Sequence, residues 1–186
     1  MTVLALRLRK AGMRPALFPY SATFERWEAC LARLHSFIER KARGEPYIIV
    51  GHSLGTVLTR ALLPRLKHKP SACFFLAPPT TACRAARKLA SRGIYRLLTG
   101  EMGQLLADPA FMNALPLPEI PTKIYSGTAG PVGTCSPFGE EPNDGVLAVA
   151  ETLLPSIPAE RVPSIHTFIM NRGSVAQDIV KITESL

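Results

Sequence analysis

Apolar residues in this sequence follow two patterns. Continuous apolar runs cover 47–50 and 72–77, are bounded by proline or glycine, and predict buried strands; 121–127 predicts a third strand. Elsewhere apolar residues recur at helical spacing, as at Trp27 and Leu31. Strands that are apolar on both faces and alternate with helices are typical of a parallel sheet covered on two sides. The sequence therefore predicts an α/β fold, a three-layer sandwich with a mostly parallel sheet.

The remaining elements are shorter or more irregular. We expect helices over 2–11, from a cap at Ser21 or Thr23 to Gly44, over 54–63 and over 174–186, and short strands over 13–20 and 161–165. Prolines within the first short strand indicate that it lies near a sheet edge. Residues 80–120 are expected to be helical or irregular. They form either a cap whose aliphatic side chains suit an acyl chain, or helices that only cover the sheet.

The first buried strand leads into a candidate nucleophile. The sequence Gly-His-Ser-Leu-Gly at 51–55 has the G-x-S-x-G spacing, with a strand before it and a helix after it. This context predicts a sharp turn that strains the backbone of Ser53 and exposes its hydroxyl. Any side chain at Gly51 or Gly55 is expected to collide with the neighbouring strand or helix. The N–H of Leu54 is expected to point to the place where an oxyanion would form.

A serine nucleophile needs a base, and the base needs an acid that orients it. In a parallel sheet these partners come from loops that follow later strands. Asp144 lies in an Asn-Asp-Gly-Val turn after the third strand, and His166 lies just before the final helix. Each residue alone is typical of an ordinary loop. Ser53, Asp144 and His166 together, in this order, predict a catalytic triad.

Other titratable residues compete less well for the two roles. Glu140 and Glu141 lie close enough to Asp144 to replace it as the acid. The weaker candidates are His52, which lies in the Gly-His-Ser turn itself and points elsewhere, His35 in mid-helix and His68 in a basic turn. Asp108, before a proline, and Asp178, within the last helix, are the weaker acids.

Length and composition predict one globular domain, residues 1–186, that buries a core without disulfides, since 47% of the residues are hydrophobic and 19% charged. Four cysteines without metal-ligand spacing are expected to be reduced and structural, with no metal or cofactor. Residues 1–12 place basic residues after apolar ones, the reverse of a secretory signal. No apolar stretch is long enough to span a membrane. We therefore expect a cytoplasmic protein.

The net charge of +8 is concentrated in two clusters, at 60–69 and at 84–96. A solvated helix face is the favoured interpretation of both. Contact with an anionic membrane surface or an acidic substrate is the alternative. Nucleic acid is not expected, because no binding module or interleaved aromatic pattern accompanies the charge.

Three segments resemble the signature segments of a known family. They are Gly-His-Ser-Leu-Gly at 51–55, Asn-Asp-Gly-Val at 143–146 and His-Thr-Phe at 166–168. They are similar to those of small bacterial α/β-hydrolases, the lipase and esterase-like members. The resemblance covers nearly the whole chain.

The resemblance implies a role for each site residue. Ser53 would be the nucleophile, His166 the general base and then acid, Asp144 the orienting carboxylate, and the Leu54 N–H an oxyanion donor. The implied reaction is hydrolysis of a small-molecule or lipid carboxylic ester through an acyl-enzyme, with no cofactor or metal. A thioester or an amide is a less favoured substrate.

The chain departs from this family at its N-terminal end. Members have a strand that ends in a His-Gly motif, lies beside the nucleophile strand and supplies a second oxyanion N–H, whereas this sequence opens at the predicted helix. Either the start lies downstream of the true one, or the protein tolerates a gap in its sheet or fills it from another chain, as in a homo-oligomer. Loss of one oxyanion donor typically costs about 10²–10³-fold in turnover. A non-catalytic binding or interaction protein of the same fold is therefore the alternative function.

Overall fold

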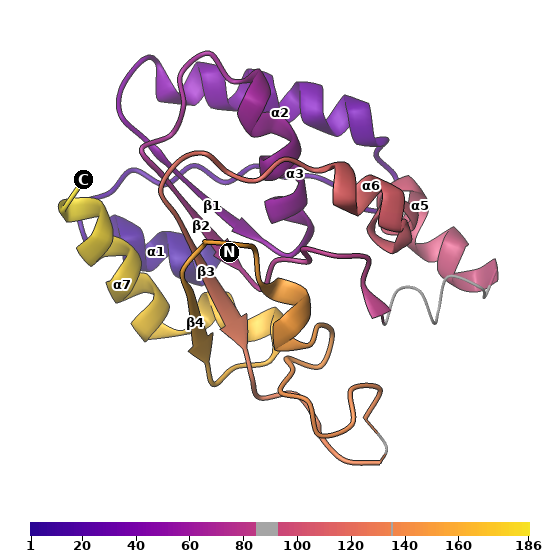
Figure 1. Ribbon diagram of the computed structural model, residues 1–186. Helices are drawn as coiled ribbons and strands as arrows, with labels where there is room; N and C mark the ends of the chain where they lie inside the picture. Colours follow the sequence, from indigo (N-terminus) through magenta and orange to yellow (C-terminus); the bar gives the residue numbers. More distant parts are fainter. Residues whose placement is uncertain (85–92, 135) are drawn as a thin grey trace.

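The computed structural model describes residues 1–84, 93–134 and 136–186. Its centre is a sheet of four strands in the order β1-β2-β3-β4, each parallel to its neighbour (Figure 1). The strands are β1 (Ile48–His52), β2 (Ala72–Leu76), β3 (Thr122–Gly127) and β4 (Ala159–Val162). The predicted α/β fold with a parallel sheet is confirmed.

Helices cover both faces of the sheet. Figure 1 shows α2 and α3 on one face, and α1 and α7 on the other. The α-helices are α1 (Thr2–Lys10), α2 (Trp27–Ala42), α3 (Leu54–Leu62), α5 (Gly93–Ala107), α6 (Pro109–Ala114) and α7 (Gly173–Glu184). The short 3₁₀ helices are η1 (Leu63–Arg65), η2 (Val149–Thr152) and η3 (His166–Asn171).

The core is divided by the sheet into two layers, because successive strand residues point to opposite faces. Phe75 and Ile124 pack under α2 and α3, whereas Phe74 and Tyr125 pack under α1 and α7. All four side chains are buried. This double burial explains why the sequence of β2 is continuously apolar rather than alternating.

The predicted strand over 13–20 is wrong. The segment belongs to no strand. Within the described ranges, no strand pairs with the outer side of β1, so β1 is an edge strand. Prolines 15 and 19 also remove two of the segment's backbone donors.

Two further boundaries differ from the prediction. The last strand covers Ala159–Val162 rather than 161–165, because Pro163 cannot donate to the ladder. The helix expected to begin at Ser21 or Thr23 begins at Trp27 instead. The Ser21 hydroxyl accepts a hydrogen bond from the Phe24 N–H at 3.2 Å, which forms a turn ahead of the helix.

The part of 80–120 that the structure describes packs beside α2. Met102 and Met112 are buried in the same core layer as Trp27, whose ring meets that of Phe111 edge-on at 5.1 Å. The buried Arg60 donates to the carbonyls of residues 115 and 116, just after α6. Residues 85–92 of the proposed cap lie outside the described residues.

The described cysteines are buried. Cys30 and Cys73 are free thiols. Burial raises the pKa of Cys30 to about 11 and also raises that of Cys73, so both stay protonated. Cys135 lies outside the described residues. Of the helices in the described ranges, none combines the length and the apolar character that crossing a membrane requires.

Asp178, one of the weaker acid candidates, joins α7 to the sheet. Its carboxylate accepts hydrogen bonds from the Tyr125 hydroxyl at 2.6 Å and from the Lys123 ammonium. Burial would raise the pKa of Asp178, but these two hydrogen bonds outweigh burial and lower it below 3.8. Its role in this structure is therefore to hold a helix in place.

We predict that Asp178→Asn lowers Tm by about 2–6 °C at neutral pH, because the amide cannot replace the ionised acceptor. Folding lowers the pKa of Asp178, so the carboxylate stabilises the fold fully at a pH above its pKa in the unfolded chain. This stabilisation is lost as the pH falls through its pKa in the folded protein. The Tm difference should shrink below about pH 4. Glu119→Gln, at an exposed carboxylate, is the control. A difference unchanged in acid would contradict this role.

Candidate active site

Ser53 connects β1 to α3 through a strained turn. Its φ is 50° and its ψ −123°, a conformation that typically costs a non-glycine residue about 1–3 kcal/mol. The Ser53 N–H donates to the Leu76 carbonyl at 3.0 Å, and the Ser53 carbonyl accepts from the N–H and the hydroxyl of Thr56 at 2.9 and 2.7 Å. These bonds to β2 and α3 hold the turn in place.

The two glycines of the motif are not equivalent. A Cβ added to Gly51 would lie 3.1 Å from the backbone N and Cα of Thr56, closer than packed atoms normally approach. A Cβ added to Gly55 would meet only the Tyr20 hydroxyl, at an ordinary 3.7 Å. The expected collision holds at Gly51 and is wrong at Gly55.

The structure brings Ser53, Asp144 and His166 together. The His166 Nε2 lies 2.9 Å from the Ser53 Oγ, and the His166 Nδ1 lies 2.7 Å from the Asp144 Oδ2. Asp144 and His166 are both buried. A carboxylate only accepts, so Nδ1 carries the proton and Nε2 is free to accept the hydroxyl proton of Ser53.

The Asp144 carboxylate is held on both of its oxygens. Its Oδ1 accepts from the N–H groups of Val146 and Leu147 at 2.9 and 2.7 Å, which leaves Oδ2 directed at His166. Its own backbone carbonyl accepts from the His166 N–H at 2.9 Å. The two loops are therefore joined through backbone and side chain at once.

Close backbone packing behind Asp144 depends on two glycines that the sequence analysis missed and on Asn143 of the Asn-Asp-Gly-Val turn. A Cβ on Gly127 would lie 2.7 Å from the Asp144 Cβ, and one on Gly130 would lie 2.8 Å from the Asp144 carbonyl carbon. Buried Asn143 donates to the carbonyls of Pro131 and Glu141 at 2.9 and 3.0 Å. The only sequence signal was the glycine content of this loop.

The alternative acids lie elsewhere. The Glu141 carboxylate accepts from the Arg84 guanidinium at 2.6 Å, and this hydrogen bond is the main cause of the raised pKa of Arg84. Glu140 is exposed. Buried Glu151 accepts from the backbone N–H groups of Ala148 and Arg84 at 2.9 and 2.7 Å. Through these hydrogen bonds Glu141 and Glu151 stabilise the loop that carries Asp144.

His52, which was expected to point elsewhere than at the Ser53 hydroxyl, is directed at the backbone carbonyl of His166. Its Nε2 lies 3.0 Å from the carbonyl oxygen of His166, and the two rings are 5.0 Å apart. Burial, followed by the nearby His166 ring, lowers the pKa of His52 to about 4. The other candidates lie in α2, on an exposed turn and at the N-cap of α6: His35, His68 and Asp108.

Leu54 is the first residue of α3. The first N–H groups of a helix have no acceptor within it, and the helix dipole makes this end partly positive. The Leu54 N–H is thus available to a developing oxyanion. In the described part of the chain, no group of three or more His, Cys, Asp or Glu side chains is arranged to hold a metal ion.

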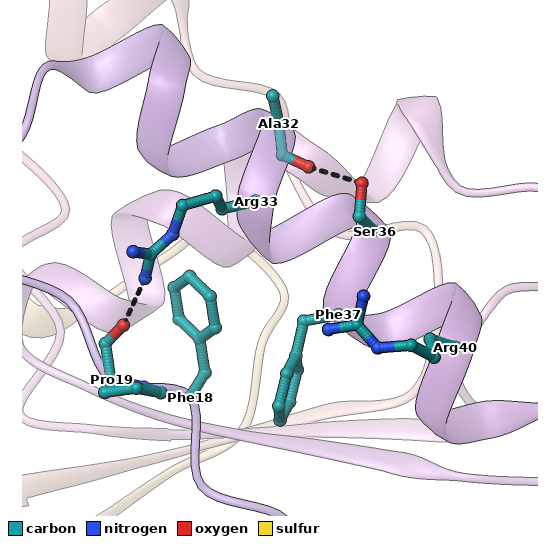
Figure 2. A pocket seen from close by; sticks show the side chains of 7 residues that line it. All are labelled: Phe18, Pro19, Ala32, Arg33, Ser36, Phe37 and Arg40. Atoms are coloured by element: carbon teal, nitrogen blue, oxygen red, sulfur yellow. Dashed lines mark hydrogen bonds between the residues drawn. The ribbon is translucent and has the colours of Figure 1, made fainter.

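A separate hollow lies between the 13–20 segment and α2. Figure 2 shows the rings of Phe18 and Phe37 lining it, 5.3 Å apart. The Arg33 guanidinium lies 5.2 Å above the Phe18 ring and donates to the Pro19 carbonyl. These contacts hold the 13–20 segment against α2, and the hollow includes none of the site residues above.

Comparison with solved structures identifies the architecture, although no protein-family model and no curated protein matches the sequence. The chain superposes on the mature form of the lipase BlEst2 from Bacillus licheniformis with a TM-score of 0.64 and 16% identity, over 86% of this chain and 74% of the lipase. The fold is that of the α/β-hydrolases.

Two other α/β-hydrolase structures superpose over almost the whole chain. Tomato methylketone synthase I matches with a TM-score of 0.62 and 12% identity over 99% of this chain and 92% of its own. The RedJ thioesterase of the Streptomyces coelicolor prodiginine pathway matches with a TM-score of 0.58 and 16% identity over 100% and 85%. The names of these proteins indicate different reactions. The α/β-hydrolase fold alone therefore does not identify the chemistry, which depends on the residues of the site.

The contrast between the two glycines gives a paired prediction. We expect Gly51→Ala to lower the free energy of unfolding by about 1–3 kcal/mol, because the new methyl group would press on the α3 backbone. Gly55→Ala should be neutral or up to about 1 kcal/mol stabilising, because alanine favours a helix. Chemical denaturation of both variants measures the difference. Equal destabilisation would contradict the geometry described for this turn.

Proposed function

We propose that this protein is a serine hydrolase that cleaves carboxylic esters through an acyl-enzyme on Ser53. The observation that carries the proposal is the chain of two hydrogen bonds from Ser53 through His166 to Asp144, at 2.9 and 2.7 Å. The strained turn that presents the Ser53 hydroxyl adds to it. Two of the similar structures are also named as a lipase and a thioesterase.

In the first half of the reaction the Ser53 Oγ attacks the ester carbonyl carbon. The Oγ–carbon bond forms, the carbonyl electron pair moves onto oxygen, and the hydroxyl proton passes to His166 Nε2. Asp144 stabilises the resulting imidazolium without taking its proton. When the tetrahedral intermediate collapses, the bond to the alcohol oxygen breaks and His166 gives that oxygen its proton.

In the second half water replaces the alcohol. His166 Nε2 removes a proton from water, the hydroxide oxygen attacks the acyl carbon, and collapse of the second intermediate breaks the bond to Ser53. Ser53 recovers its proton from His166, and the carboxylic acid leaves. The Leu54 N–H would stabilise the oxyanion in both intermediates.

Apolar side chains at the rim favour an apolar substrate. Val146, Ile165 and Phe168 lie within two residues of Asp144 or His166 and are exposed, Phe168 by 55%. Exposed apolar groups on the segments that carry Asp144 and His166 suit an acyl chain or an apolar alcohol. We therefore favour an ester with an aliphatic acyl group over a small polar one.

The position of β1 favours a second candidate function. In the part of the chain that the structure describes, no strand lies along the outer side of β1 to bring a second oxyanion N–H beside Ser53. Losing one donor typically costs about 10²–10³-fold in turnover. The alternative is a non-catalytic binding or interaction protein with the α/β-hydrolase fold.

A fluorophosphonate probe tests the proposal directly. We expect covalent labelling of the folded protein at Ser53, and hydrolysis of p-nitrophenyl esters that increases with acyl-chain length. Ser53→Ala should abolish labelling and reduce turnover by about 10⁶-fold, to background. A folded protein that is neither labelled nor active would overturn the hydrolase and favour the binding module.

The role of Asp144 has a matched control in Glu140. Asp144→Asn should reduce kcat by about 10⁴-fold, because a neutral amide neither stabilises the His166 imidazolium nor fixes the tautomer of the neutral His166 ring. Glu140→Gln, at an exposed carboxylate of the same loop, should leave kcat unchanged. Ester hydrolysis measures both, with Tm as the check on folding. A larger loss in the Glu140 variant would move the acid role to that residue.

A further inference from the structure

Two consecutive residues at the end of β1 reach the same histidine. The Ser53 Oγ lies 2.9 Å from the His166 ring, and the His52 Nε2 lies 3.0 Å from the His166 carbonyl oxygen. Successive side chains of a strand normally point to opposite faces of the sheet. Here Ser53, with its φ of 50°, contacts the ring of residue 166, while His52 contacts the carbonyl oxygen of the same residue.

The contact defines the protonation state of His52. A carbonyl oxygen only accepts hydrogen bonds, so the His52 Nε2 must carry the proton. The His52 pKa of about 4, lowered chiefly by burial and next by the His166 ring, keeps the imidazole neutral at physiological pH. The ring is therefore a neutral donor with the proton on Nε2.

Every polar group of His166 is occupied in this arrangement. Its N–H donates to the Asp144 carbonyl at 2.9 Å and its Nδ1 to the Asp144 carboxylate at 2.7 Å. Its Nε2 accepts from Ser53, and its carbonyl accepts from His52. Three of these bonds join the proposed catalytic residues to one another. The fourth ties their loop to the rigid end of β1.

We propose that His52 is a positioning residue, whose Nε2–H holds the backbone of residue 166 so that the imidazole stays between Ser53 and Asp144. The inference rests on the proposed hydrolase function. The His52 ring and the Asp144 carbonyl hold the main chain of residue 166 from its C=O and its N–H, while the Asp144 carboxylate controls the direction of its ring. A displacement of about 1 Å in such a group can cost on the order of 100-fold in rate.

The charges around His52 favour a neutral donor. The groups that face it are the His166 ring from η3, the Asp144 carboxylate from the preceding loop, and the amino group of Met1 at the start of α1. During turnover His166 becomes an imidazolium about 5 Å away. A lysine or arginine donor at position 52 would add a like charge there, whereas the neutral imidazole donates without one.

Three variants test the role. His52→Phe keeps an apolar ring and removes the donor, and His52→Gln keeps an N–H of similar reach. We expect His52→Phe to lower kcat about 10–100-fold with KM unchanged, and His52→Gln to recover most of the loss. His68→Gln, at an exposed histidine, should behave as the wild type. Tm of each variant shows whether it folds.

Imidazole ¹⁵N and ¹H NMR provides a readout that does not depend on activity. His52 should show the Nε2–H tautomer at pH 7, and the downfield Nδ1–H resonance of His166 should shift in His52→Phe and return in His52→Gln. If the wild type neither hydrolyses esters nor reacts with the fluorophosphonate, the hydrolase function fails, while these resonances still report the contact. An Nδ1–H tautomer of His52, or an unchanged kcat and His166 resonance in His52→Phe, would overturn the positioning role.

Discussion

The backbone strain at Ser53 is the constraint on which the rest of the site depends. A serine with φ of 50° is unfavourable by itself and persists only because its neighbours hold it, through hydrogen bonds to Leu76 and Thr56 and the tight packing of Gly51 on α3. The strain lifts the hydroxyl out of the sheet, toward the His166 ring. One unfavourable backbone conformation thus presents the Ser53 hydroxyl to its partner.

The other half of the site depends on polar groups that are fully satisfied away from water. Asp144, on the loop after β3, and His166, at the start of η3 after β4, are buried at the carboxyl edge of the sheet, where β1 also ends. Gly127 allows the Asp144 loop to come close, and Glu151 fixes its far end through backbone N–H groups. An unpaired buried carboxylate would be costly, so these bonds stabilise the loop and direct Oδ2 at the histidine.

Sequence patterns predicted the parts of this protein whose structure depends on residues close together in the sequence. The apolar run, the G-x-S-x-G spacing and the helix after it lie within a few residues of one another, so the strained turn follows from them. The order of Ser53, Asp144 and His166 led us to expect the proximity that the structure shows, while their catalytic roles stay a proposal. The strand over 13–20 was wrong because pairing depends on a distant neighbour. The hydrogen bond of His52 to the His166 carbonyl was not predicted, because it joins residues 114 positions apart in the sequence.

The edge position of β1 places the reactive serine at the end of a strand whose second side has no partner in the described ranges. Ile48, Ile49 and Val50 are only partly buried there. The backbone of any chain that adds to this edge would lie about 4.8 Å from the strand that carries Ser53. A chain that added to this edge would therefore lie beside the strand that ends at the serine.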